Sequence, residues 1–191
     1  MDNPARHHRN FDCRISGGMV RTAQGLRLRI IDMRFAALER FVNLASRGGG
    51  STAVIMLDLD NFKQLNDEHG HAKGDAVLRD VAAQLIGGLR PTDVVCRYGG
   101  EELVVLLPEC SLDEAAKKAE QLRERIEALS STHQANITAS LGVASVPETA
   151  TSIVDVVPSA DAALYAAKHA GKNCVMVAAK RVPSRSHLVS V

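Results

Sequence analysis

Two strongly apolar runs separated by only six residues constrain this chain more than any other feature. The runs cover 94–96 and 103–107, and the segment between them holds Gly99 and Gly100. Strands joined by so short a connection pair antiparallel, because a parallel crossover needs a dozen residues or more. We therefore expect an α+β or mixed-sheet fold, and a purely parallel, doubly wound sheet is excluded.

The remaining periodicity predicts helices and strands on both sides of this hairpin. Gly70 and Gly74 are expected to bracket a loop, and Ser111 and Glu114 form a capping box that opens a helix. The predicted elements are a helix over 35–44, a buried strand over 53–57, helices over 61–68, 77–86 and 115–129, a half-buried strand over 137–143, a helix over 158–170 and a closing strand over 174–177.

Composition describes an ordinary globular chain. Apolar residues make up 46% and charged residues 24% of its 191 residues, enough for one domain with a real core. The formal net charge of +1 and the absence of Trp argue against a nucleic-acid partner. No signal-peptide pattern or membrane-length apolar run occurs, so we expect a cytoplasmic protein with reduced thiols at Cys96 and Cys174.

Carboxylates gather at the ends of two predicted strands. Asp58 and Asp60 end the run that begins at Ala53, and Glu101 and Glu102 follow the hairpin glycines. Carboxylate oxygens are the ligands that Mg²⁺ takes in proteins, and glycines let backbone N–H groups approach a phosphate. Taken singly, Asp58 is better explained as a turn cap and Glu101 as a solvated hairpin acid, and the glycines as a plain turn; metal binding is favoured for the two acids jointly.

Several ordered motifs together resemble the GGDEF domains, the diguanylate cyclases, from about residue 35 to 177. The central motif is a Gly-Gly-Glu-Glu variant with Leu103 where the family usually has Phe. The matching segments are LDLDNFK (57–63), ND (66–67), GH (70–71), GD (74–75), RYGGEE (97–102) and SLGV (140–143), together with Ala160, Asp161, Ala163, Tyr165, Ala167, Lys168, Gly171, Lys172 and Asn173.

This resemblance implies a palm-like fold with a central, mostly antiparallel sheet flanked by helices and a β-hairpin carrying the signature. It implies condensation of two GTP into cyclic di-GMP with release of pyrophosphate, using Mg²⁺ or Mn²⁺. Because one chain offers one GTP pocket, the active species should be a homodimer. We expect a catalytic domain over 31–179, a poorly ordered, degenerate head over 1–30 and a flexible tail over 180–191.

By the same resemblance, the metal is held by Asp58, Glu101 and the Leu59 carbonyl. Glu102 acts either at the metal or at the 3′-hydroxyl, with a surface acid as the plainer alternative. The residues assigned to GTP are Phe62, Lys63, Asn66, Asp75, Gly99, Gly100, Lys168 and Lys172. Asn66 and Asp75 would read guanine, since a carboxylate accepts from N1–H and the 2-amino group. Asp75 also fits a helix N-cap.

Arg90 and Asp93 match the family's inhibitory R-x-x-D site for cyclic di-GMP, at the expected offset from the signature. Their alternative role is a helix-to-strand connection with incidental charges. The supporting arginine that often comes from the following helix is replaced near its position by Gln121, with Arg123 two residues further on. The affinity of such a product site is therefore open.

The chain departs from the family at its start, where 23–29 is a poor counterpart of the usual D-x-L-T-G-L-x-N-R-R segment. That departure favours a second hypothesis: a catalytically weak or inactive module that serves as a receptor for cyclic di-GMP or GTP. A third hypothesis is a palm-type nucleotidyl cyclase with another base. Asp75 argues against it, because a carboxylate suits guanine.

Overall fold

The structure is a computed structural model that describes residues 19–21, 27–29, 31–32 and 50–181. The helix expected over 35–44 lies outside the described residues, as does most of the N-terminal motif. Within the expected head, two short strands, β1 (Met19–Arg21) and β2 (Arg27–Arg29), pair antiparallel. In the described part of the chain, no helix has the length and apolar character needed to cross a membrane.

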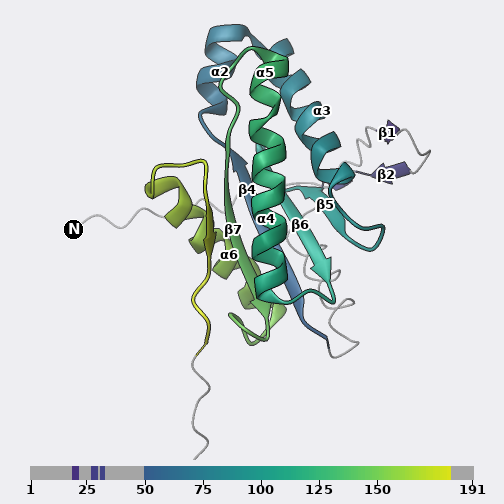
Figure 1. The fold of residues 1–191 in the computed structure, drawn as a ribbon, viewed down its shortest axis with the longest axis vertical. Helices are drawn as coiled ribbons and strands as arrows, with labels where there is room; N and C mark the ends of the chain where they lie inside the picture. The colour runs from purple at the N-terminus through teal and green to yellow at the C-terminus, as the bar shows by residue number, and fades with distance from the viewer. Residues whose placement is uncertain (1–18, 22–26, 30, 33–49, 182–191) are drawn as a thin grey trace, which may run out of the picture.

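A six-stranded sheet forms the centre of the molecule, in the order β3-β5-β6-β4-β7-β8 (Figure 1). The two edge pairings, β3 with β5 and β7 with β8, are parallel and the three central ones are antiparallel. This confirms the expected mostly antiparallel sheet with its hairpin, β5 to β6. The strands are β3 (Ile31–Asp32), β4 (Thr52–Leu59), β5 (Val94–Arg97), β6 (Glu102–Pro108), β7 (Ala139–Val146) and β8 (Val175–Val177).

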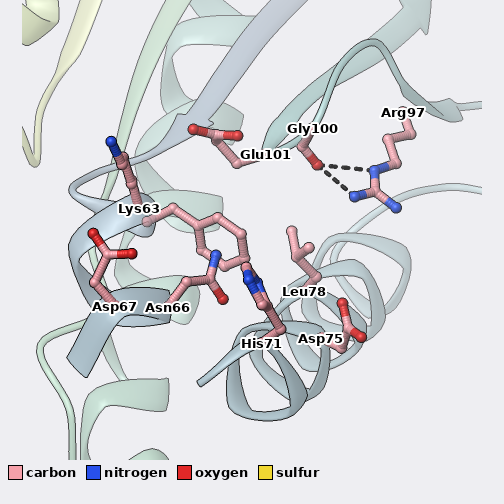
Figure 2. A pocket seen from close by; sticks show the side chains of 10 residues that line it. Lys63, Asn66, Asp67, His71, Asp75, Leu78, Arg97, Gly100 and Glu101 are labelled. Atoms are coloured by element: carbon pink, nitrogen blue, oxygen red, sulfur yellow. Dashed lines mark hydrogen bonds between the residues drawn. The ribbon is translucent and has the colours of Figure 1, made fainter. Parts of the chain in front are cut away.

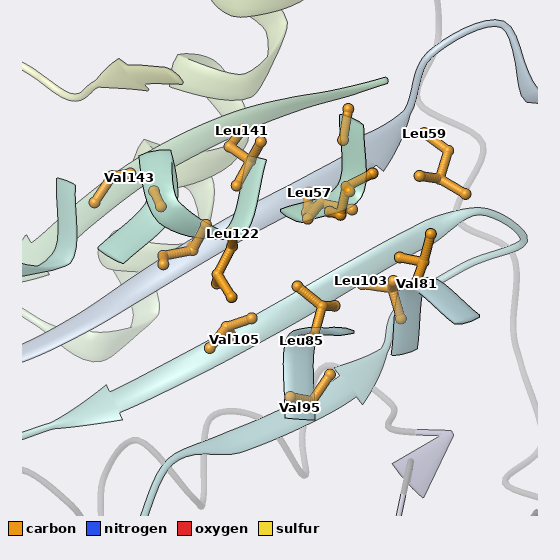
Figure 3. Close-up of a cluster of buried hydrophobic side chains, with 14 of the residues drawn as sticks. Leu57, Leu59, Val81, Leu85, Val95, Leu103, Val105, Leu122, Leu141 and Val143 are labelled. Atoms are coloured by element: carbon orange, nitrogen blue, oxygen red, sulfur yellow. The ribbon is translucent and has the colours of Figure 1, made fainter. Parts of the chain in front are cut away.

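Helices cover both faces of the sheet. One core cluster joins alternate residues of β4, such as Ile55 and Leu57, to α3 and α4. The other joins the intervening residues, Val54 and Met56, to α6. Figure 3 shows the first cluster, with Leu85 and Leu122 reaching the strands from their helices. The helices are α2 (Phe62–His69), α3 (His71–Gly87), α4 (Leu112–Glu127), α5 (Leu129–His133) and α6 (Ile153–His169).

β7 is buried along almost its whole length, so the prediction of a half-buried strand is wrong. An alternation of apolar and small polar residues predicts that one face of the strand is exposed to solvent. Instead, α4 packs on one side of β7 and α6 on the other. The small side chains and Gly142 provide room: a Cβ at Gly142 would collide with backbone atoms of Leu164 and Ala160 in α6.

Two helix starts also differ from the prediction. α3 begins at His71, so Gly74 lies inside the helix rather than at the end of a loop. α6 begins at Ile153, with Pro158 inside it. Proline is common at the first helical position, which is why the sequence placed the start there. Ser159 Oγ donates to the Asp155 carbonyl, 2.7 Å away, in this first part of α6.

The capping box of α4 is confirmed. Ser111 Oγ accepts from the Glu114 backbone N–H, while the Glu114 carboxylate accepts from the Ser111 backbone N–H at 2.9 Å. Such reciprocal bonds satisfy N–H groups that the first helical turn leaves unpaired. The start of α4 is thereby fixed shortly after the end of β6, and the helix packs on one face of the sheet.

Candidate active site

The register of the central strands brings two of the expected catalytic acids together. Asp58 of β4 stands opposite Glu102 of β6 and, on its other side, opposite Ser140 of β7. Residues directly opposite in an antiparallel pair have Cβ atoms about 5 Å apart. Asp58 also continues the row of Val54 and Met56, so it lies on the face that α6 covers.

Lys168 reaches this acidic pair from α6. Its Nζ lies 2.8 Å from Asp58 Oδ2, and only 8% of Asp58 is exposed. Burial raises the pKa of Asp58, the Lys168 ammonium opposes the rise, and the charges of Glu101 and Asp60 add to it. The structure thus pairs Lys168, which the resemblance assigns to GTP binding, with a carboxylate of the site.

Glu102 is the second acid whose ionisation the site disfavours. Burial raises the pKa of Glu102, and Asp58, Asp161 and Glu101 raise it further, while Lys168 lowers it. Three carboxylates, those of Asp58, Glu101 and Asp161, therefore act on Glu102, and Lys168 is the cation that opposes them. Asp161 was not assigned a role from the sequence. Its spacing offered a signal, since it precedes Lys168 by seven residues and so shares a face of α6.

The hairpin between β5 and β6 is held by an arginine on its own first strand. Arg97 donates from Nε and Nη2 to the Gly100 carbonyl at 2.9 and 2.6 Å, as Figure 2 shows. A Cβ at Gly99 would collide with the Glu102 carboxylate, whereas a Cβ at Gly100 would meet nothing within 4 Å. A side chain at Gly99 would therefore displace the Glu102 carboxylate, and Gly100 leaves an open backbone surface next to Glu101.

A pocket of about 440 Å³ opens beside this hairpin. Figure 2 shows Asn66 of α2 and Asp75 of α3 on one side and Glu101 and Gly100 on the other. Five expected GTP-binding residues and one expected metal ligand thus line one cavity. Its lining residues are Phe62, Lys63, Asn66, Asp67, His71, Asp75, Leu78, Arg97, Gly100 and Glu101.

Gly74 of α3 leaves room for side chains of α2, one of which is the guanine-binding candidate Asn66. A Cβ there would collide with the Asn66 amide and crowd the Phe62 ring. Asp75 follows within α3, so its alternative role as an N-cap is wrong. The sequence matched Gly74 to a motif but did not predict this contact, because it depends on the packing of α2 against α3.

Asp60 has a role that the sequence did not predict. It is 7% exposed, and its carboxylate accepts from Thr138 Oγ1 at 2.9 Å, from Ser140 Oγ at 2.7 Å and from the Asn173 backbone N–H at 3.0 Å. Lys172, just before Asn173, donates to Asn61 Oδ1 at 2.5 Å. Lys172 is thereby placed at the start of α2, because Asn61 immediately precedes that helix.

The donor set at the strand ends suits a hard divalent cation. Asp58 and Glu101 carry carboxylate oxygens, and the Leu59 carbonyl follows Asp58 on the same strand end. Their mutual repulsion, together with that of Glu102, is what a bound cation would offset. Among the described residues, no cluster of three or more His, Cys, Asp or Glu side chains has the geometry of a self-contained metal site. Remaining ligands would have to come from phosphate and water.

Arg90 and Asp93 lie in the connection between α3 and β5. Asp93 is 4% exposed; its Oδ2 accepts from the Arg90 backbone N–H at 2.7 Å, and its own N–H donates to the Arg90 carbonyl. The carboxylate of Asp93 thus holds the turn, while Arg90 is exposed. Arg123 of α4 is engaged elsewhere, with Glu120, Glu127 and Asn173.

Comparison with known families gives one match that covers most of the chain. A family model described as "Diguanylate cyclase, GGDEF domain" matches residues 33–174. The span includes every residue to which the sequence assigned a role in the site, from Asp58 to Lys172.

Curated relatives agree over the same region. The response regulator PleD of Caulobacter vibrioides is 35% identical over 144 residues, which are 73% of this chain and 32% of that protein. Diguanylate cyclase A of Treponema denticola is 36% identical over 74% of this chain and 39% of its own length. An uncharacterised Bacillus subtilis protein, YhcK, is 40% identical over 68% of this chain and 37% of its own. The chain thus spans about a third of the length of these relatives.

Solved structures share the fold. The active GGEEF domain of a diguanylate cyclase from Vibrio cholerae has a TM-score of 0.70 and 30% identity, covering 77% of this chain and 95% of that one. The GGDEF domain of DgcB from Caulobacter crescentus, in complex with c-di-GMP, has a TM-score of 0.66 and 34% identity, covering 74% and 84%.

Proposed function

This chain belongs to the GGDEF domain family, and from that membership we propose that it is a diguanylate cyclase, which condenses two GTP into cyclic di-GMP and two pyrophosphates. The observation that carries the proposal is the pairing of Asp58 with Glu102 across β4 and β6, beside a pocket lined by Asn66, Asp75 and Glu101. A nucleotide substrate of this kind is found in the cytoplasm, where we expect the reaction.

The proposed reaction needs charge to be offset at a phosphate. In each of two steps, a 3′-hydroxyl of one GTP attacks the α-phosphorus of the other, the bond to the β-phosphate breaks and pyrophosphate leaves. Mg²⁺ or Mn²⁺, held by Asp58, Glu101 and the Leu59 carbonyl, would supply Lewis-acid stabilisation of the charge on the triphosphate.

The residues around that position have separate proposed tasks. Lys63, Lys168 and Lys172 bind phosphate oxygens, and the Gly99–Gly100 backbone gives the triphosphate room. In the structure Lys168 contacts Asp58, so binding of phosphate would draw it from a carboxylate to a second anion. Glu102, whose pKa is raised, accepts the proton of the attacking 3′-hydroxyl, because a higher pKa makes a carboxylate a better base.

Selectivity for guanine is assigned to Asn66 and Asp75. Both line the pocket, on adjacent helices, and Gly74 leaves room for the Asn66 side chain. The Asp75 carboxylate can accept from N1–H and the 2-amino group, a donor pair that adenine lacks. Phe62 supplies an apolar surface within the same pocket. GTP is therefore expected to be preferred over ATP.

The direct test is turnover of GTP by the purified chain at high protein concentration with Mg²⁺ or Mn²⁺. Chromatography should show cyclic di-GMP from GTP and no cyclic product from ATP. Glu101→Ala should abolish product while keeping the melting temperature. Glu124→Ala, which removes an exposed acid of α4, is the matched control and should keep full activity. Turnover by Glu101→Ala would contradict the assignment of the site.

Product inhibition at Arg90 is a further part of the proposal. Arg90 is exposed and can bind guanine or phosphate in a bidentate manner. Asp93 holds the turn that presents it. Arg90→Ala should keep the initial rate but prolong the linear phase of the reaction, as cyclic di-GMP accumulates. Arg79→Ala, an exposed arginine of α3, is the control. If product formation by Arg90→Ala levels off at the same product concentration as in the unaltered chain, Arg90 does not have this role.

The second candidate function is that of a binding module. The poor N-terminal motif favours it, because in the family this segment helps to wall the guanine pocket. Folded protein that binds GTP or cyclic di-GMP but yields no product at any concentration would support it over the cyclase.

A further inference from the structure

Asp60 lies at the centre of a hydrogen-bond network next to the proposed site. Its Oδ1 accepts from Ser140, and its Oδ2 accepts from Thr138 and from the Asn173 backbone N–H. Three donors satisfy a buried carboxylate that would otherwise be costly to desolvate. Asp60 thus joins the end of β4, the start of β7 and the turn after α6.

Asn173 continues this network on the other side. Its Oδ1 accepts from Arg123 Nη1 at 2.8 Å, and its Nδ2 donates to Glu127 Oε1 at 2.9 Å. The backbone of Asn173 is therefore tied to the sheet through Asp60, while its side chain is tied to α4. The Arg123 side chain is only 13% exposed and is occupied by these contacts, which marks it as structural.

The turn that these bonds hold has an unusual backbone. Gly171, Lys172 and Asn173 have φ angles of 118°, 66° and 45°. Residues with a Cβ seldom adopt positive φ, and they keep it only where their surroundings fix it. The bonds at Asn173 are among the described contacts that hold this turn, together with the bond from the Lys172 N–H to the Ala167 carbonyl at 3.1 Å. Lys172 lies between Gly171 and Asn173.

We propose that Asp60 and Asn173 are positioning residues that hold Lys172 at the start of α2, ready for a phosphate of the bound nucleotide. In the structure the Lys172 ammonium contacts Asn61 there. Asp60 acts through the turn and touches no substrate itself. The phosphate part rests on the proposed function, whereas the claim that Asp60 and Asn173 fix the turn does not.

Hydrogen exchange tests the positioning without any need for activity. In Asp60→Ala, the amides of Lys172 and Asn173 should exchange at least about tenfold faster, since local opening becomes easier, while amides of β4 stay protected. Asp60→Asn should restore protection, because an amide oxygen can accept from Asn173 and the NH₂ group can donate to Ser140. Unchanged exchange in Asp60→Ala would overturn the proposal.

Nucleotide binding then tests the link to Lys172. Asp60→Ala should weaken GTP binding about tenfold, the loss expected for one charge-assisted bond to phosphate, and leave guanosine binding unchanged. Asp60→Ala should add nothing further in a Lys172→Ala background, because the two residues act on one contact. Additive losses, or equal losses for guanosine, would overturn the positioning role. Asn136→Ala, an exposed asparagine before β7, is the control.

Two further outcomes are separable. If Asp60→Ala does not fold, Asn173→Gly takes its place: it keeps the positive φ, removes both links to α4, and should produce the same exchange and binding changes. If the unaltered chain binds no GTP, the proposed function fails, and the exchange experiment alone still decides whether Asp60 fixes the turn.

Discussion

Asp58 carries an energetic cost that its proposed function explains. It is nearly buried on the α6 face, beside Glu101, Glu102 and Asp60, with Lys168 as its cationic partner. A site whose ionised groups repel one another is less stable than it could be, but it is suited to bind a cation or a positively charged clamp. A substitution that removes this repulsion should therefore raise the stability of the fold and lower its activity.

Asp58→Asn should raise the melting temperature at pH 8 by about 2–4 °C and abolish turnover. The raised pKa of Asp58 means that its contribution to stability is fully present below its ordinary pKa of 3.8 and is lost as pH rises through the raised value. The gain in the variant should therefore grow with pH and vanish in acid. Lys168, left unpaired, is 35% exposed and can reach water.

Thermal melts from pH 4 to pH 8 measure this effect. Asp113→Asn is the control, because the Asp113 side chain is 76% exposed and pairs only with Lys180 in the described structure. It should show no such pH-dependent gain. A lower melting temperature for Asp58→Asn at pH 8 would mean that the ion pair with Lys168 outweighs burial.

At the scale of elements, the approach of α6 to β7 decides where Lys168 ends. Gly142 of β7 stands opposite Met56, two residues before Asp58 on β4, and the α6 backbone at Ala160 and Leu164 lies against it. Lys168 follows Leu164 by one helical turn. The close contact at Gly142 therefore sets the reach of Lys168 to the acidic pair.

Gly142→Ala should destabilise the fold by about 3 kcal/mol, because the new methyl group meets helix backbone that has no side-chain freedom with which to move. Ser145→Ala on the same strand is the control: its Oγ is buried and has no hydrogen-bond partner in the described structure. Removing that hydroxyl should stabilise by about 1 kcal/mol. Chemical denaturation measures both, and a wild-type midpoint for Gly142→Ala would refute this packing argument.

At the scale of the whole molecule, the proposed product exceeds what one chain can make. One described pocket provides for one GTP, and cyclic di-GMP joins two, so two chains must face each other with their sites opposed. The chain spans only part of the length of its relatives.

Activity per chain should therefore rise with protein concentration. Fusing a parallel dimeric coiled coil to the N-terminus should raise the specific activity at low concentration tenfold or more, by raising the effective concentration of the second site to about the millimolar range. Rates measured across a dilution series, with and without the fusion, test this. Specific activity that is independent of dilution in the unfused chain would argue for a preformed tight dimer, and a fused chain with no gain would argue against the facing-site arrangement.

The hairpin and the family could be predicted from the sequence, and the site residues could be assigned from it, for local reasons. Short connections force antiparallel pairing, the capping box of Ser111 and Glu114 fixes the start of α4, and the spacing of the signature places acids at strand ends. Asn66, Asp75 and Glu101 were assigned from motifs, and the structure brings them to one pocket. The roles of these residues remain predictions for the experiments above.

Which surfaces are covered and which side chains meet depends on how the helices pack on the sheet, and the sequence pattern did not show this. Periodicity could not tell that β7 is buried on both faces, because burial depends on which helices pack there. It could not show that Asp58 pairs with Lys168 while Asp60 accepts from the Asn173 backbone, nor that Gly142 permits the close approach of α6. These features join residues that are far apart in the chain. A local sequence pattern does not show which distant residues will come into contact in the folded protein.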